Sequence, residues 1–168
     1  MTQESIRLFE QEIRLTSKLC HPNTISIFDY GNTADDLFYY AMEYIDGLTL
    51  DELSRSYSTI PDGRVLNLLL QACGSLAEAH SYGLVHRDIK PQNIMVSEGA
   101  GYGDRITVLD FGLVTESHSM RDRNLPVRGT PLYMSPEAIQ RQRTVDARSD
   151  LYSLAATAYV LLTGQPVF

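Results

Sequence analysis

The spacing of apolar residues in the first quarter of the chain predicts one helix followed by two strands. Over 4–19, apolar side chains recur at the spacing expected for one face of an amphipathic helix. Two runs rich in β-branched and aromatic residues, 25–30 and 37–42, lie on either side of a polar turn. We therefore expect a helix and then a pair of strands joined by that turn.

A long apolar helix is predicted for the middle of the chain. Residues 64–81 carry apolar side chains on most of the helical circumference, which predicts a helix buried on all sides. Two short apolar strands, 94–96 and 106–109, flank a glycine-containing segment that is expected to form a hairpin turn. A last helix is expected to begin at Asp150 and to stop at Gly164. Strands early and helices late predict an α+β arrangement.

Composition narrows the class of protein. The sequence has 14 Lys and Arg residues against 21 Asp and Glu residues, a formal net charge of −7, which argues against nucleic acid as a partner. Cys20 and Cys73 form no paired motif, so we expect two small buried side chains in a reducing compartment rather than a disulfide or metal site. The longest apolar run, 151–162, is too short to span a bilayer. No membrane segment and a cytoplasmic location are expected.

Three sequence blocks carry the chemistry. They are HRDIKPQN at 86–93, DFG at 110–112 and GTPLYMSPE at 129–137. Each block alone is a modest signal, because an isolated Asp-x-x-x-x-Asn or DFG is usually a turn. Their order and spacing together resemble the eukaryotic-like (Hanks-type) serine/threonine protein kinases, and in particular their bacterial members. The resemblance implies a bilobal protein-kinase-like fold of the α+β class.

The resemblance also implies a reaction, the ATP-dependent transfer of a phosphoryl group to serine or threonine hydroxyls of a protein substrate. Asp88 matches the carboxylate that accepts the proton of the substrate hydroxyl, and Lys90 matches the cation that neutralises the γ-phosphate. Asn93 and Asp110 match the ligands of Mg²⁺, a hard cation that prefers oxygen. Lys90 and the GTPLYMSPE block both favour serine/threonine over tyrosine as the acceptor. ATP and Mg²⁺ are the expected cofactors.

The same resemblance places the nucleotide. Met42 matches the gatekeeper position, and Glu43 and Ile45 match the hinge that meets adenine. Met95 is expected to form part of the floor below the adenine ring. Lys90, together with the aspartate of DFG, is expected at the phosphates.

Further positions match structural or regulatory residues of the family. They are Glu12, His86, Arg87, Phe111, Gly112, Thr130, Glu137 and Asp150. Glu12 matches the glutamate of the C-helix, His86 and Phe111 match the regulatory spine, and Asp150 is expected to anchor the loop that carries the base. Arg87 implies control by phosphorylation of the segment after DFG, where Thr115, Ser117 and Ser119 are the candidate acceptors.

The resemblance covers the whole chain, whereas the chain matches only part of the family's domain. Nothing in the sequence matches the first three strands of the N-lobe, with their glycine loop and ion-pair lysine, or the last helices of the C-lobe. Its only lysines are Lys18 and Lys90. We therefore expect a partial protein kinase domain over 1–168, truncated at both ends. Residues 1–45 are expected to be the remainder of the N-lobe with the C-helix and hinge, and 46–168 the C-lobe with the catalytic loop and activation segment.

Two functions remain open at this point. The first is a serine/threonine protein kinase. The alternative is a pseudokinase-like regulatory or binding module with little turnover, because the glycine loop and ion-pair lysine are absent from the sequence. The presence of Asp88, Asn93 and Asp110 favours the first, whereas the missing ion-pair lysine favours the second and predicts poor or no turnover from this chain alone.

Overall fold

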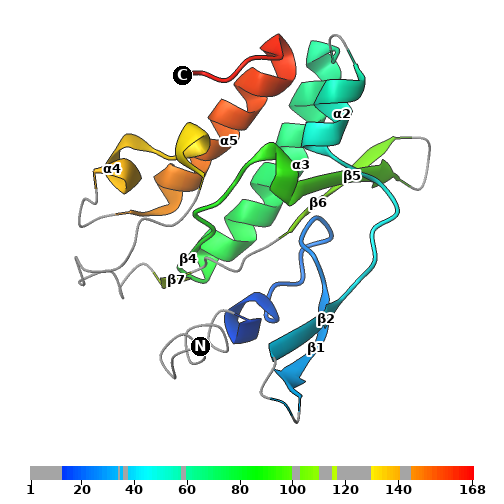
Figure 1. Ribbon diagram of the computed structural model, residues 1–168, viewed down its shortest axis with the longest axis vertical. Coiled ribbons are helices and arrows are strands. Elements are labelled where there is room, and N and C mark those ends of the chain that lie inside the picture. The colour runs from blue at the N-terminus through cyan, green and yellow to red at the C-terminus, as the bar shows by residue number, and fades with distance from the viewer. Residues whose placement is uncertain are drawn as a thin grey trace.

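The structure, a computed structural model, describes most of the chain. The described residues are 13–33, 35, 38–57, 60–99, 103–109, 115–116, 130–140 and 145–168. They form a mixed α and β molecule in which a two-stranded sheet lies apart from a larger helical part (Figure 1). This arrangement agrees with the α+β class expected from the sequence.

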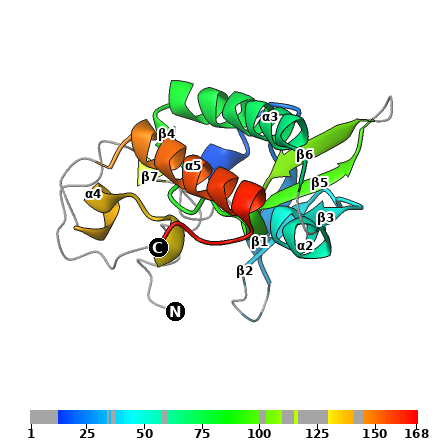
Figure 2. The same cartoon turned by 90° about the horizontal axis from the view of Figure 1, so that it is seen from above.

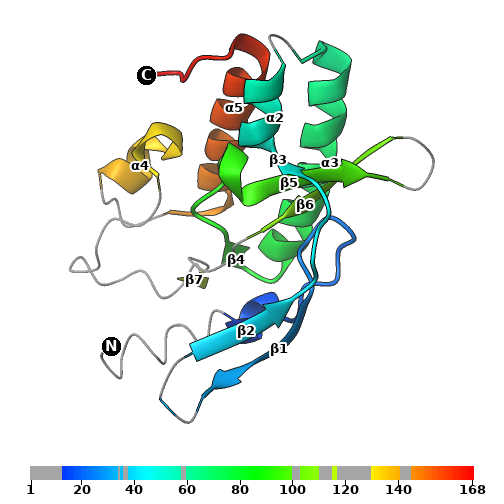
Figure 3. The ribbon, with the colours of Figure 1, turned by 45° about the vertical axis from the view of Figure 1, so that its right-hand side comes forward.

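Two antiparallel strands form the part nearest the amino terminus. Strand β1 (Ile27–Asn32) pairs with β2 (Phe38–Met42), and a bulge near Ile27 interrupts the register. Both strands lie within two residues of the predicted positions. Of the helix expected over 4–19, the structure describes one turn, 13–16, as helical. In Figure 3 the β1–β2 sheet projects from the rest of the molecule, and the described side chains of β2 are exposed.

A short strand and a short helix follow the predicted hinge, the segment 43–47 after β2. Strand β3 (Leu48–Thr49) leads directly into α2 (Leu50–Ser56). The helix begins with a reciprocal cap: Thr49 Oγ1 accepts a hydrogen bond from the Glu52 amide at 3.2 Å, and Glu52 Oε2 accepts one from the Thr49 amide at 2.8 Å. These hydrogen bonds lower the pKa of Glu52, because they stabilise its ionised form.

The long helix α3 (Asp62–Ser81) packs on one side only. Its buried residues include Val65, Leu68 and Leu76, which belong to the hydrophobic core. Figure 2 shows α3 running alongside the last helix of the chain. Leu66 and Leu70 are 59% and 63% exposed, so the expectation of burial all round was wrong. The described elements that pack on α3 contact the face that carries its buried residues, not the face of Leu66 and Leu70. An apolar sequence does not show which faces of a helix other elements will cover.

The core sheet is built from a hairpin. Strand β5 (Ile94–Glu98) pairs antiparallel with β6 (Asp104–Val108), and β3 pairs with the other edge of β5. The Gly99 amide donates a hydrogen bond to the Gly103 carbonyl at 2.6 Å, which closes the hairpin predicted for this glycine-containing segment. A second small sheet joins β4 (Leu84–Val85) to β7 (Thr115–Glu116).

The last helix, α5 (Ala147–Thr163), starts earlier than predicted. Its N-cap is Asp146, whose Oδ1 accepts a hydrogen bond from the Arg148 amide at 2.9 Å. Asp150 therefore does not cap the helix; it lies inside the first turn, fully buried. The predicted stop at Gly164 is confirmed, since this residue takes a left-handed φ of 70° that suits glycine.

Two further expectations concern the cysteines and the membrane. Cys20 and Cys73 are both exposed and unpaired, so the expectation that they are buried was wrong. Nothing in the sequence around either cysteine predicted that so small an apolar side chain would be exposed. Among the described residues, no helix combines the length and the apolar character needed to cross a bilayer.

Candidate functional site

The loop that follows β4 is held to the core by one buried carboxylate. Asp150 of α5 accepts hydrogen bonds from the His86 amide at 2.9 Å (Oδ2) and from the Arg87 amide at 2.8 Å (Oδ1). His80, near the end of α3, contacts Asp150 Oδ2 through Nε2 at 2.8 Å. Arg87 has a left-handed φ of 69°, which is uncommon for a residue with a side chain. The two backbone bonds to Asp150 hold the loop in this turn.

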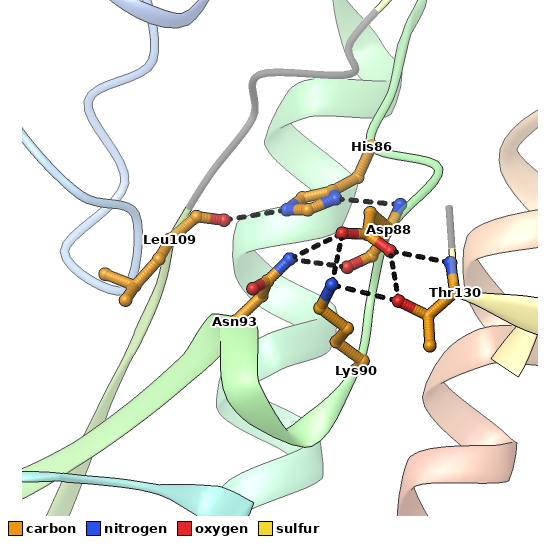
Figure 4. A network of polar contacts seen from close by, with 6 residues as sticks. All are labelled: His86, Asp88, Lys90, Asn93, Leu109 and Thr130. Atoms are coloured by element: carbon orange, nitrogen blue, oxygen red, sulfur yellow. Dashed lines mark hydrogen bonds and ion pairs between the residues drawn. The ribbon is translucent and has the colours of Figure 1, made fainter. Parts of the chain in front are cut away.

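His86 links the same loop to the end of β6. Its side chain is fully buried, and its Nε2 contacts the Leu109 carbonyl at 2.8 Å. The Asp88 amide donates a hydrogen bond to His86 Nδ1 at 3.3 Å. Because Nδ1 accepts, Nε2 carries the proton and donates to Leu109. His86 therefore joins this loop to Leu109, the residue that immediately precedes the DFG block in the sequence (Figure 4).

Asp88 lies at the centre of a polar network formed with Lys90, Asn93 and Thr130. Lys90 Nζ lies 2.7 Å from Asp88 Oδ2 and donates a second hydrogen bond to Thr130 Oγ1 at 2.9 Å. The Thr130 amide and hydroxyl donate to Asp88 Oδ1 at 3.0 and 3.1 Å. Figure 4 shows the three side chains converging on one point. The Asp88 and Lys90 side chains are only 14% and 20% exposed, so solvent screens this ion pair weakly.

Asn93 completes the network from the other side. It ends the short 3₁₀ helix η1 (Pro91–Asn93), where the Asn93 amide donates to the Lys90 carbonyl at 3.0 Å. Its side-chain Nδ2 donates to the Asp88 carbonyl oxygen at 2.9 Å and to Asp88 Oδ2 at 3.1 Å. Its amide oxygen consequently points away from Asp88 (Figure 4). An outward amide oxygen beside the Asp88 carboxylate is a suitable ligand for Mg²⁺, which prefers oxygen.

The segment that contains Thr130 is packed against α5. Thr130 precedes the 3₁₀ helix η3 (Pro131–Tyr133), and the Tyr133 carbonyl accepts a hydrogen bond from Ser153 Oγ at 2.7 Å. Glu137, in α4 (Pro136–Ile139), accepts a hydrogen bond from Ser149 Oγ at 2.6 Å. This bond lowers the pKa of Glu137.

The residues expected around adenine lie at the end of β2, in the connection from β2 to β3, and on β5. Met42 ends β2, and the Glu43 amide donates to the Ser26 carbonyl at 3.0 Å while Glu43 Oε1 accepts from the Ser26 amide at 2.9 Å. Ile45 is half-buried in the connection to β3. Met95 of β5 pairs with Thr49 of β3, so it lies beside the strand that follows the hinge.

The close approach at Gly47 explains how the hinge enters the core sheet. A Cβ atom at this position would lie 2.3 Å from the Val96 carbonyl oxygen, well inside van der Waals contact. Only glycine lets the backbone pass this close to β5. The path of the hinge toward α2 therefore depends on the absence of a side chain at one residue.

Four expected site residues lie outside the described residues. They are Glu12, Asp110, Phe111 and Gly112. Two of the three candidate phosphorylation sites, Ser117 and Ser119, also lie outside them. Among the expected residues that it describes, the structure brings four into contact: Asp88, Lys90, Asn93 and Thr130. It also joins His86 and Arg87 to Asp150.

Two supporting residues had no signal in the sequence. His80 reaches Asp150 from a helix seventy residues away in the chain, and Ser149 reaches Glu137 from the start of α5. Both contacts depend on how distant elements pack.

Comparisons with known proteins agree with this geometry. The family model described as "Protein kinase domain" matches residues 1–168. Serine/threonine-protein kinase pkn3 of Myxococcus xanthus is 38% identical over 167 residues, which cover 96% of this chain and 30% of that protein. Serine/threonine-protein kinase PrkC of Bacillus subtilis is 37% identical, with 98% of this chain and 25% of that protein covered. The chain thus spans less than a third of the length of these relatives.

A solved structure shares the fold. The crystal structure of the PknI kinase domain of Mycobacterium tuberculosis, a C20A mutant, superposes with a TM-score of 0.77 at 30% sequence identity. The match covers 99% of this chain and 60% of that chain. The bilobal protein-kinase-like fold expected from the three sequence blocks is therefore confirmed.

Proposed function

This chain belongs to the protein kinase domain family, and from that premise we propose that it carries out ATP-dependent phosphoryl transfer to serine and threonine hydroxyls of proteins. The observation that supports the proposal most directly is the network in which Asp88 contacts Lys90, Asn93 and Thr130. A carboxylate, a cation beside it and an asparagine whose amide oxygen faces outward are groups that phosphoryl transfer uses. We further propose that 1–45 belongs to the smaller lobe and 46–168 to the larger lobe.

Asp88 acts as the proton acceptor in this proposal. The acceptor hydroxyl oxygen forms a bond to the γ-phosphorus, the bond from that phosphorus to the β–γ bridging oxygen breaks, and ADP carries the electron pair away. The hydroxyl proton passes to Asp88, which Thr130 holds in place through two hydrogen bonds. Lys90 stabilises the negative charge on the transferring group.

The nucleotide is proposed to bind between the two parts of the molecule. The backbone of Glu43 and Ile45 would meet the adenine edge, Met42 would lie behind it and Met95 would lie below it. Asn93, through its outward amide oxygen, and Asp110 would hold Mg²⁺, which when bound neutralises phosphate charge. Asp110 lies outside the described residues, so its part rests on the DFG block alone.

A transfer assay tests the proposal. The full chain is incubated with Mg²⁺ and γ-labelled ATP and a generic basic protein, beside an Asp88→Asn variant and an Asp62→Asn control in the exposed first turn of α3. We expect labelled acceptor with the wild type and the control, and a loss of about 10²-fold or more with Asp88→Asn, as removal of a general base requires.

The alternative function predicts a different pattern in the same assay. A pseudokinase-like module would bind nucleotide and transfer no label, with or without the substitution at Asp88. Transfer that survives Asp88→Asn would contradict the role proposed for this carboxylate.

A further inference from the structure

The carboxylate of Asp88 has all of its acceptor positions occupied by donors from this chain. An ionised carboxylate offers about four lone-pair positions, two on each oxygen. Oδ1 accepts from the amide and the hydroxyl of Thr130, at 3.0 and 3.1 Å. Oδ2 accepts from Lys90 Nζ at 2.7 Å and from Asn93 Nδ2 at 3.1 Å. A substrate hydroxyl can donate to Asp88 only after one of these four donors leaves.

Three of the four donors belong to Asn93 and Thr130, two residues that other hydrogen bonds hold in place. Asn93 Nδ2 is also bonded to the Asp88 carbonyl at 2.9 Å, and the Asn93 amide is bonded to the Lys90 carbonyl at 3.0 Å. The Thr130 carbonyl accepts from the Tyr133 amide at 3.0 Å, and Ser153 in turn holds the Tyr133 carbonyl at 2.7 Å. Moving Thr130 or Asn93 would therefore break backbone hydrogen bonds as well.

Lys90 is the donor that can leave. Its ammonium group stands at the end of a flexible four-carbon chain, and both of its hydrogen bonds here are made by that group alone. A polyphosphate carries several negative charges, whereas Asp88 carries one. The Lys90 side chain is only 20% exposed, so solvent screens its charge weakly. A bound polyphosphate, with its greater negative charge, would therefore draw the ammonium group away from Asp88.

We propose that Lys90 masks the base: it occupies Asp88 Oδ2 until a nucleotide polyphosphate withdraws it, so that nucleotide must bind before an acceptor hydroxyl can reach the carboxylate. This inference rests on the proposed function and adds an order of binding to it. Asn93 and Thr130 keep Asp88 oriented throughout, and the position that Lys90 vacates is the one that receives the hydroxyl.

Crosslinking without a spacer tests the ion pair directly. A water-soluble carbodiimide joins a carboxylate to a contacting amine as an amide, with loss of water. Only Lys18 and Lys90 carry side-chain amines in this chain, so few lysine crosslinks are possible, and fragment ions in mass spectrometry identify the carboxylate joined to Lys90 as Asp88. Lys90→Arg, which keeps the charge and forms no such bond, is the matched negative control. Lys18 is exposed and serves as an internal control. If the nucleotide affected the carbodiimide itself, the rate at which Lys18 is acylated would change.

The crosslink is measured in the full chain with and without Mg²⁺ and a non-hydrolysable ATP analogue. Occupancy of the nucleotide site is followed separately, through the ¹³C-methyl signals of Met42 and Met95. We expect the crosslink before the analogue is added. At about ten times the dissociation constant of the analogue, its yield should fall to about a tenth, because that is the unoccupied fraction.

The outcomes separate the inference from the proposed function. A crosslink yield that stays constant while the methionine signals shift would overturn the masking role and leave the proposed function standing. Absence of the crosslink before nucleotide is added would overturn it as well, since the ion pair would then not form in solution. Methionine signals that never move would overturn the proposed function and the inference with it.

Discussion

At the scale of single residues, the loop that carries the base depends on Asp150 more than on any residue within the loop. Asp150 is fully buried and accepts from two backbone amides, and it also contacts His80. A buried carboxylate with several donors leaves each of them unsatisfied when it is removed, which costs more than the hydrogen bonds themselves contribute.

Asp150→Asn is expected to lower the free energy of unfolding by about 2–4 kcal/mol, because an amide NH₂ would replace one acceptor oxygen and face a donor. Urea unfolding followed by circular dichroism measures the effect. Asp62→Asn, in an exposed first turn, serves as the control and should change stability little. A variant as stable as wild type would show that Asp150 does not hold the loop.

The pair of Glu137 and Ser149 predicts a pH dependence. The hydrogen bond from Ser149 lowers the pKa of Glu137 in the folded chain below its ordinary value of 4.5. A lowered pKa contributes stability above pH 4.5 and loses it as the pH falls through the folded value. Ser149→Ala should therefore destabilise the chain at pH 7 and have a smaller effect at pH 3. Equal losses at both pH values, in matched urea titrations, would contradict this assignment.

At the scale of elements, the sequence predicted most helices and strands, and its errors have physical causes. The strands around Ile94 and Ile106 and the stop at Gly164 follow from apolar runs and glycine chemistry, which are local. The start of α5 was placed at Asp150 because aspartate is a good cap, whereas Asp146, four residues earlier, caps the helix and Asp150 is buried in its first turn. Exposure of Leu66 was missed because periodicity does not reveal which faces find a partner.

Gly47 supplies a prediction at this scale. Gly47→Ala would place a Cβ 2.3 Å from the Val96 carbonyl oxygen, so the hinge or β5 must shift. We expect a loss of about 1–3 kcal/mol in unfolding free energy, as for an overpacked core site. Gly63→Ala is the matched control, because its Cβ meets nothing within 4 Å and lies in the first turn of α3. That variant should be neutral or slightly stabilising, as alanine favours the helix. Equal stability of the two variants would contradict the close approach.

At the scale of the whole molecule, the segment between the first helical turn and β1 joins the two parts. Asn23 Nδ2 donates to the Ile106 carbonyl at 2.7 Å, and the Thr24 hydroxyl lies 2.7 Å from that of Ser75. Glu78 of α3 accepts from the amides of Cys20 and His21. No sequence pattern predicted these contacts, because they join residues more than fifty positions apart. The same limit applies to the candidate site. The three sequence blocks predicted which residues belong to it, whereas the hydrogen bonds between those residues could be identified only from the structure.

Glu78 therefore anchors the segment that carries the amino-terminal part onto α3. Its Oε1 and Oε2 accept from the Cys20 amide at 3.0 and 3.1 Å, and Oε2 accepts from the His21 amide at 2.9 Å. Glu78→Gln replaces one acceptor with a donor, so hydrogen exchange at these two amides should accelerate about ten-fold, the equivalent of about 1.4 kcal/mol. Exchange across β5 and β6 should not change. Glu98→Gln, exposed on β5, is the control. Unchanged exchange at Cys20 and His21 would show that the rest of the segment holds the two parts together without Glu78.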